Sequence, residues 1–188
     1  MTKQNNTEET STKTKVDFTV QMNTITKKIN EIDQEKYDVQ GFVDELGYWV
    51  NDLYWFYNVI VKPGQDPSKI PFKIKPSLRP KEGQVAYFNL RRGYPKELYD
   101  GHYCYVLKDF GLKFLIIPTT SVKKDSSELN PNNEIKIEIK DFKNDYETRI
   151  QVSDIRVVDT QRFKPNKGVY DVLTEQSYII QEIKRILF

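Results

Sequence analysis

Residues 103–119, YCYVLKDFGLKFLIIPT, decide the fold class of the second half of the chain. Two apolar runs, 103–107 and 113–119, stand on either side of the segment 108–111, KDFG. A short segment that carries Asp and Gly between two apolar runs is typical of a tight turn between antiparallel strands. The stretch therefore predicts a β-hairpin with strands at 103–107 and 113–119.

Alternation of apolar and polar residues extends this β pattern on both sides of the hairpin. Residues 84–90 form a predicted strand before it. Residues 134–139, EIKIEI, carry isoleucine at every second position, which predicts a half-buried strand after it. Residues 149–152 and 155–158 are predicted to form two further short strands or a bent pair.

The last segment, 169–187, returns to helical spacing. The residues expected to share one face of this helix are Leu173, Gln176, Ile180, Ile183 and Leu187. The fold class is therefore mainly β with added helices (α+β). We predict a small, mostly antiparallel β-barrel with one C-terminal helix, preceded by a helical N-terminal extension.

The first half of the chain has a different character. Apolar residues recur three and four positions apart between residues 18 and 60, which predicts helices with a break near 34–37. Residues 53–57, LYWFY, are apolar on all sides, which predicts burial in the core or against another chain. The predicted division of the chain is a disordered tail at 1–16, a helical extension at 17–62, a proline-rich linker at 63–80 and a barrel domain at 81–188.

The composition limits the classes of function. With 30 % charged residues but a net charge of only +2, any RNA binding must come from a local patch. The single cysteine, Cys104, lies in an apolar run and is expected to be buried. One histidine and one cysteine do not make the usual zinc site, so neither metal nor cofactor is expected. No membrane span and no signal peptide are predicted, so a cytoplasmic location is expected.

Four short segments of the second half carry the functional information. They are EGQVAYFNL at 82–90, ELYDGHYCYVL at 97–107, IIPTTS at 116–121 and VSDIRVVDTQRF at 152–163. In this order they resemble the motifs of the PemK/MazF toxins of bacterial toxin–antitoxin systems. The resemblance covers residues 81–188.

The resemblance implies an SH3-like antiparallel barrel of the CcdB/Kid/MazF type, usually a homodimer. It also implies a metal-independent endoribonuclease that cuts single-stranded RNA and is held in check by a cognate antitoxin protein. In the family, an arginine of the second motif and a threonine of the third perform catalysis. The threonine matches Thr120, whereas His102 stands at the position of the arginine and Tyr103 replaces the proline that follows it.

Cleavage of RNA without a metal needs a base for the ribose 2′-hydroxyl, an acid for the 5′-oxygen and hydrogen-bond donors for the phosphate. We expect His102 to transfer protons, since imidazole does so near neutral pH, and Thr120 to donate a hydrogen bond to the phosphate. Arg91, Arg92 and Lys96 are expected to hold phosphates as mobile charges. The residues predicted to contact RNA are Arg91, Arg92, Lys96, Tyr99 and Ser121.

Two alternatives stay open at this point. The change of arginine to histidine at position 102 also fits a non-catalytic member of the same fold that binds RNA or a protein partner. A third reading is a poison of DNA gyrase, as in the CcdB branch of the fold. Three roles fit the N-terminal extension: packing on the barrel, extending a dimer interface, or covering the RNA groove as an internal inhibitor.

Overall fold

The computed structural model describes residues 17–142 and 147–188. The predicted disordered tail, 1–16, lies outside these described residues. Contacts within the chain define two units, residues 1–41 and residues 42–188.

The first unit contains helix α1, Thr19–Glu31, and the first residues of helix α2, Val39–Trp55. Between the two helices the backbone turns, and the Asp38 carboxylate accepts a hydrogen bond from the Gly41 N–H at 2.9 Å. A carboxylate in this position satisfies one of the unpaired N–H groups at the start of a helix. The predicted break near 34–37 is confirmed.

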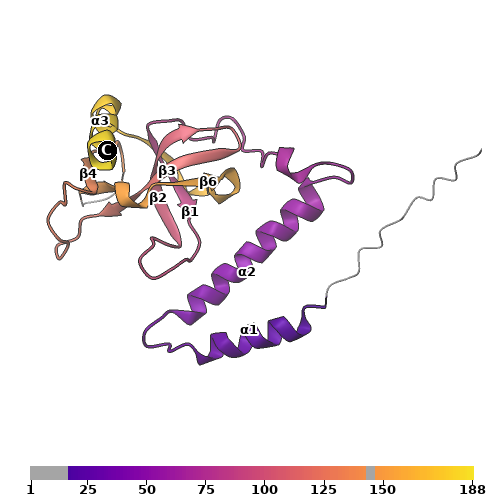
Figure 1. The fold of residues 1–188 in the computed structure, drawn as a ribbon. Helices are drawn as coiled ribbons and strands as arrows, with labels where there is room; N and C mark the ends of the chain where they lie inside the picture. The colour runs from indigo at the N-terminus through magenta and orange to yellow at the C-terminus, as the bar shows by residue number, and fades with distance from the viewer. Residues whose placement is uncertain (1–16, 143–146) are drawn as a thin grey trace, which may run out of the picture. The chain divides into compact units, whose positions relative to one another are not determined.

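The second unit contains the rest of α2 and a seven-stranded sheet. The strands are β1 Gln84–Asn89, β2 Gly101–Asp109, β3 Lys113–Ser121, β4 Glu134–Ile137, β5 Thr148–Gln151, β6 Arg156–Asp159 and β7 Val169–Asp171. Their order is β4-β5-β3-β2-β1-β7, with β6 paired to β3, and the six ladders among the described residues are all antiparallel. Figure 1 shows helix α3, Gln176–Leu187, next to β4 at the end of this sheet. An α+β fold with an antiparallel sheet and a C-terminal helix is therefore confirmed.

Strand β3 is the centre of the sheet. It pairs with β2 along one edge, and with β6 and then β5 along the other. Its side chains alternate between two apolar clusters, so Ile116 belongs to one and Ile117 to the other, and both are fully buried. A strand buried on both faces reads as a continuous apolar run, which explains the sequence FLIIP at 114–118.

The sheet is open rather than closed into a ring. Among the described residues, β4 and β7 at its two ends share no ladder. An isolated bridge between Ile139 and Val172 lies beside them, and the Leu173 N–H donates to the carbonyl of Glu138 at 2.8 Å. The two ends therefore approach each other without forming a continuous ladder.

The prediction for the last segment is wrong at its beginning. Val169–Asp171 is strand β7, which pairs with β1, and the helix begins only at Gln176. The buried face of α3 is formed by Ile179 and Ile183, which belong to the same apolar cluster as the isoleucines of β4.

Leu173 and Leu187, expected on that buried face, are 54 % and 43 % exposed, and Ile180 is half-buried. Two features of the sequence explain the difference. The helical spacing begins at residues that lie outside the helix. In addition, isoleucines at both 179 and 180 let either face of the helix be read as the apolar one.

The segment 53–57 is not buried in the core of the described chain, and burial against another chain stays a prediction. Leu53, Tyr54, Trp55 and Tyr57 are each at least 40 % exposed, so the described chain does not enclose them. Helix α2 continues into a π-helical turn, Phe56–Ile60. The remaining short turns are 3-10 helices at Pro67–Lys69, Val152–Asp154, Thr160–Arg162 and Pro165–Lys167.

The proline-rich linker is anchored at its end by Arg79. Its guanidinium donates two hydrogen bonds of 2.6 Å to the Asp109 carboxylate and lies 4.7 Å from the centre of the Phe114 ring. Both side chains of the ion pair are 24 % exposed.

Among the described helices, none is long and apolar enough to cross a membrane.

We predict that Ile179→Ala destabilises the fold much more than Leu187→Ala. Ile179 is fully buried between α3 and the sheet, so its truncation leaves a cavity and costs about 2–5 kcal/mol of unfolding free energy. Leu187 is 43 % exposed, and its truncation should change the unfolding free energy by less than about 0.5 kcal/mol. Urea unfolding of both variants measures the difference, and equal losses would contradict the observed orientation of α3.

We also predict that Arg79→Ala lowers the unfolding free energy by about 1.5–3 kcal/mol at neutral pH, because it removes a bidentate charged pair. The hydrogen bond from Arg79 holds the pKa of Asp109 below its ordinary value. The ionised Asp109 therefore adds stability above its unfolded pKa, near about 4, and this contribution is lost as pH falls through the folded pKa. The deficit of the variant should shrink below about pH 4.

Lys69→Ala is the matched control, since the ion pair of Lys69 with Asp66 is exposed. If Lys69→Ala lowers the unfolding free energy as much as Arg79→Ala does, Arg79 does not anchor the linker.

Candidate functional site

The two residues predicted to perform catalysis lie at the same end of neighbouring strands. His102 is the second residue of β2, and Thr120 is the second-last residue of β3. The ladder pairs Cys104 with Pro118, and the Thr119 hydroxyl donates to the carbonyl of Tyr103 at 2.8 Å, one residue beyond it. That ladder ends at the Cys104–Pro118 pair, and Thr120 itself pairs with Arg149 of β5, so His102 and Thr120 lie just past the end of the β2–β3 ladder. Because side chains alternate along a strand, His102 points to the same face of β2 as Cys104.

The entry of the chain into β2 is fixed by close packing. The ring of Tyr87 lies so near Gly101 that a Cβ atom there would collide with it, so any larger residue at position 101 would displace that ring. The Leu90 N–H donates to the carbonyl of Asp100 at 2.6 Å and closes the loop between β1 and β2 at its base. His102 therefore starts from a well-defined backbone position.

Arg92 is not the mobile charge that the sequence predicts. Its guanidinium donates to both carboxylate oxygens of Asp100, at 2.9 and 2.8 Å, and its side chain is 8 % exposed. It also lies 5.1 Å from the centre of the Tyr99 ring. These contacts make Arg92 a cross-link within the loop.

Arg91 is likewise held within the protein. Its backbone is left-handed (φ 65°), a conformation that costs a non-glycine residue about 1–2 kcal/mol. The side chain of Asn89 accepts the Arg91 N–H at 2.9 Å, and the guanidinium is ion-paired with Glu45 at 3.2 Å and with Asp52. With 11 % of its side chain exposed, Arg91 is also not mobile.

The other residues predicted to contact RNA differ in exposure. Lys96 and Tyr99 are exposed on the loop, whereas Ser121 is half-buried on β3 and pairs with Thr148 of β5. Ser121 is next to Thr120 in the chain, whereas Arg91 lies past the end of β1. The predicted residues thus fall into two groups, one at the end of β3 and one on the loop between β1 and β2.

Arg156, from the fourth motif, connects that loop to β6. Its guanidinium donates to the carbonyl of Leu98 at 3.3 Å and to the carboxylate of Asp154 at 3.1 Å. The Leu98 N–H donates to the same carboxylate at 3.4 Å.

Cys104, on β2, is fully buried as predicted, and burial raises the pKa of its thiol. The thiol is therefore a protonated core group rather than a nucleophile.

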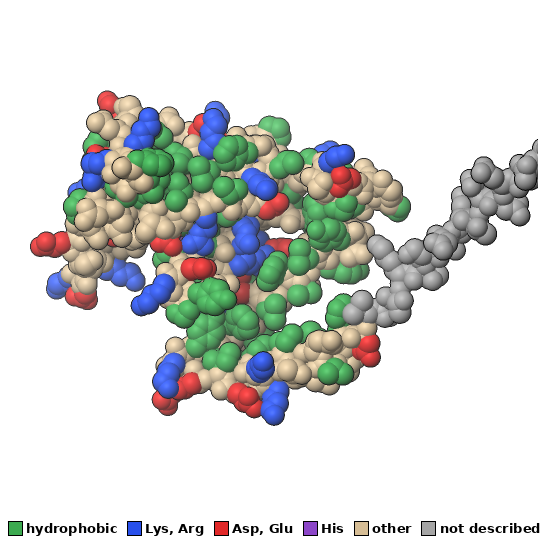
Figure 2. All heavy atoms as spheres, viewed as in Figure 1, with side chains coloured by type: hydrophobic (Ala, Val, Ile, Leu, Met, Phe, Trp, Pro, Cys, Tyr) green, Lys and Arg blue, Asp and Glu red, His purple; other side chains and the backbone are tan. Residues whose placement is uncertain are grey.

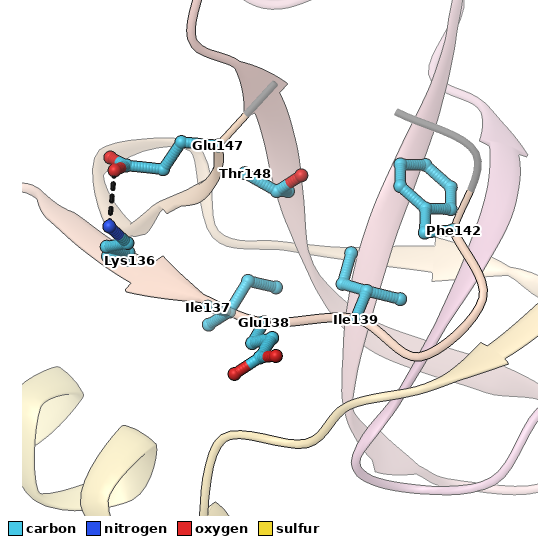
Figure 3. Close-up of a pocket in the computed structure, with 7 residues that line it drawn as sticks. All are labelled: Lys136, Ile137, Glu138, Ile139, Phe142, Glu147 and Thr148. Atoms are coloured by element: carbon cyan, nitrogen blue, oxygen red, sulfur yellow. Dashed lines mark ion pairs between the residues drawn. The ribbon is translucent and has the colours of Figure 1, made fainter. Parts of the chain in front are cut away.

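Two pockets bear on the search for a site. Figure 3 shows one of about 420 Å³ along β4, with isoleucines 137 and 139 beside Phe142 and the Lys136–Glu147 ion pair at its side. It contains none of the predicted residues. A smaller pocket of about 210 Å³ is lined by Arg91, Arg162, Asp52 and the aromatic side chains of Trp49, Phe56 and Tyr57, among others.

The sequence reasoning missed this second pocket and the acidic residues of α2 near it. Arg162 was visible in the fourth motif, but nothing in the sequence connects it to residues 49–57. In the view of Figure 2, basic and acidic side chains are interspersed over the surface. Among residues 17–142 and 147–188, no cluster of three or more His, Cys, Asp or Glu side chains is placed to hold a metal ion.

A search against known protein families finds no family that matches this chain, and a search of curated proteins finds no match either. The four motifs and the antiparallel fold are therefore what a functional proposal has to rest on.

We predict that Arg92→Ala destabilises the protein by about 1.5–3 kcal/mol, because it leaves Asp100 without its charged partner and frees the loop. Lys96→Ala is the control on the same loop, and since Lys96 is exposed it should change stability by less than about 0.5 kcal/mol. Denaturant unfolding compares the two. Equal stability of the two variants would mean that the Arg92–Asp100 pair does not hold the loop.

Proposed function

We propose that the protein is a metal-independent endoribonuclease that cuts single-stranded RNA, a toxin of the PemK/MazF type. The observation that carries the proposal is that His102 and Thr120 lie at the same end of two hydrogen-bonded neighbouring strands, β2 and β3. The order of the four motifs and the antiparallel sheet with its C-terminal helix support it. In this proposal the open sheet corresponds to an SH3-like barrel of the CcdB/Kid/MazF type.

The reaction uses the ribose 2′-hydroxyl as the nucleophile. The 2′-oxygen bonds to phosphorus, the bond from phosphorus to the 5′-oxygen breaks, and the products are a 2′,3′-cyclic phosphate and a 5′-hydroxyl. His102 takes the proton of the 2′-hydroxyl, and water supplies the proton for the 5′-oxygen. Thr120 donates a hydrogen bond to a non-bridging phosphoryl oxygen, where negative charge develops.

Histidine suits this position in a way that arginine does not. A guanidinium stabilises phosphoryl charge well but hardly ever releases a proton, whereas imidazole exchanges protons near neutral pH. The change from the family's arginine therefore moves the chemistry toward proton transfer. Stabilisation of the phosphate then falls more heavily on Thr120 and on the backbone around it.

The remaining parts of the proposal concern partners. A cytoplasmic toxin of this type has a cognate antitoxin protein and commonly forms a homodimer. Exposed aromatic side chains at the end of α2, such as Tyr54 and Trp55, offer apolar surface for a second chain. Single-stranded RNA is the substrate.

We predict that His102→Ala lowers the rate of RNA cleavage about 100- to 10,000-fold without unfolding the protein, since it removes the group that transfers the proton. His102→Arg should keep some activity and lose most of the dependence on pH between about 5 and 8, because arginine does not titrate there. The measurement is cleavage of a labelled single-stranded RNA in the presence of EDTA, with mapping of the fragment ends.

Lys113→Ala, at the opposite end of β3, is the control and should cleave at the wild-type rate. Cleavage by His102→Ala at that same rate would make His102 a structural residue and end its catalytic role. RNA binding by the wild-type protein without any cleavage would favour the alternative, a non-catalytic binding module of the same fold.

A further inference from the structure

Two carboxylates of α2 reach the end of β1. Glu45 accepts hydrogen bonds from the side-chain amide of Asn89 at 3.0 Å and from the Arg91 guanidinium at 3.2 Å. Asp52 is ion-paired with the same guanidinium and lies 3.9 Å from the ammonium of Lys164. Glu45 and Asp52 are seven residues apart, so they share one face of the helix.

Three cations gather where these carboxylates arrive. Arg162 donates to the carbonyl of Asn89 at 3.2 Å, which brings it beside Arg91, and Lys164 completes the group. Burial, with Arg91 nearby, lowers the pKa of Arg162. Cations placed together in this way need anions between them, and Asp52 and Glu45 supply these.

The groups that bind the two carboxylates are also groups that bind phosphate. A guanidinium presents its N–H groups to a carboxylate and to a phosphate in the same forked geometry. Arg91 is held in a left-handed backbone conformation, and the side chain of Asn89 fixes that conformation. The orientation of the guanidinium is therefore built into the end of β1, whichever anion it binds.

The helix that brings the carboxylates is only lightly attached. Between residues 42 and 55, α2 contains no buried side chain. The Asp52 and Lys164 side chains are 37 % and 36 % exposed, so solvent and other anions reach the contact. An exposed charge contact such as that of Asp52 with Lys164 contributes little stability, so a competing polyanion can replace it.

We propose that Arg91, Arg162 and Lys164 form a binding site for the phosphates of single-stranded RNA, and that Glu45 and Asp52 of α2 occupy this site as an internal competitor. The inference rests on the proposed action on RNA, but it concerns binding, so it is tested without cleavage. In the unliganded protein the helix masks the site. RNA binds by replacing the two carboxylates.

The test compares the double variant Glu45→Gln, Asp52→Asn with the wild-type protein. The probe is a short fluorescent single-stranded RNA with 2′-O-methyl groups, which block the nucleophile, and fluorescence anisotropy gives the dissociation constant. We expect the double variant to bind about tenfold more tightly. Its affinity should also depend more steeply on salt, by about 0.7 in the logarithmic slope for each additional phosphate that the protein neutralises.

The matched control is Glu82→Gln, Glu182→Gln. These carboxylates pair with Lys108 and Arg185 elsewhere on the surface, so their removal raises the net charge by the same amount. The control should bind like the wild type. Adding Arg91→Ala to the double variant should abolish the increase in affinity. Equal affinities of the double variant and the control would overturn the inference, as would failure of all the proteins to bind the probe.

A second measurement uses the wild-type chain and does not depend on a variant that folds. Hydrogen exchange of the backbone amides at residues 42–55 should become faster when the 2′-O-methyl RNA binds, because the helix is displaced. Slower or unchanged exchange would overturn the inference, since α2 would then be part of the RNA site or indifferent to it.

The two proposals fail in different ways. If the double variant binds more tightly but unmodified RNA is not cleaved, the proposal of an internal competitor is supported and the proposal of a ribonuclease is contradicted. If the wild type cleaves RNA but the double variant and the charge-matched control bind with equal affinity, the proposal of a ribonuclease is supported and the proposal of an internal competitor is contradicted.

Discussion

The fold depends on one strand, β3, which is hydrogen-bonded along both edges and buried on both faces. Its first part lies between β2 and β6, and at Thr119 its outer partner changes to β5. Backbone groups in a buried strand must all be paired, so this change of partner determines where each neighbouring strand begins and ends. The end at which β3 changes partner is also the end of the sheet at which β2 begins. The candidate catalytic residues therefore lie where the sheet divides.

Local patterns in the sequence were sufficient for the hairpin of β2 and β3 and for the alternating strand β4, because period-two alternation and a turn are properties of neighbouring residues. They were insufficient for β7, whose three residues are too few to show a period. The orientation of α3 depends on tertiary packing, and the spacing alone predicts a face on which only Ile183 is buried. At the candidate site, His102 and Thr120 lie at the same end of the hairpin of β2 and β3, a placement that follows from the turn between the two strands. The contact of Arg91 with Glu45 joins residues 46 positions apart, and no local pattern reveals it.

Arginine residues in this chain serve mainly as cross-links between segments that lack regular hydrogen bonds. Arg79 holds the linker, Arg92 closes a loop, and Arg156 joins that loop to β6. On β5, Arg149 is buried and paired with Glu134 and Glu147. Each forms a charged hydrogen bond to a specific carboxylate or carbonyl, which is stronger than a neutral one. A count of basic residues therefore overstates the charge available to a polyanion. What matters for RNA is which of the charged pairs can exchange one anion for another, and the Asp52–Lys164 contact of α2 is among the exposed ones.

The burial of Cys104 makes its thiol a built-in reporter of opening of the sheet. This thiol is the only one in the chain, it lies two residues from His102, and its side chain is enclosed by β1, β3 and β6. A thiol reagent can modify it only when those strands separate, so the modification rate counts openings of the sheet beside the candidate site. Fraying of the termini or movement of α2 leaves that rate unchanged. The kinetics of one chemical label can therefore distinguish a protein that rearranges its helix from one that opens its core.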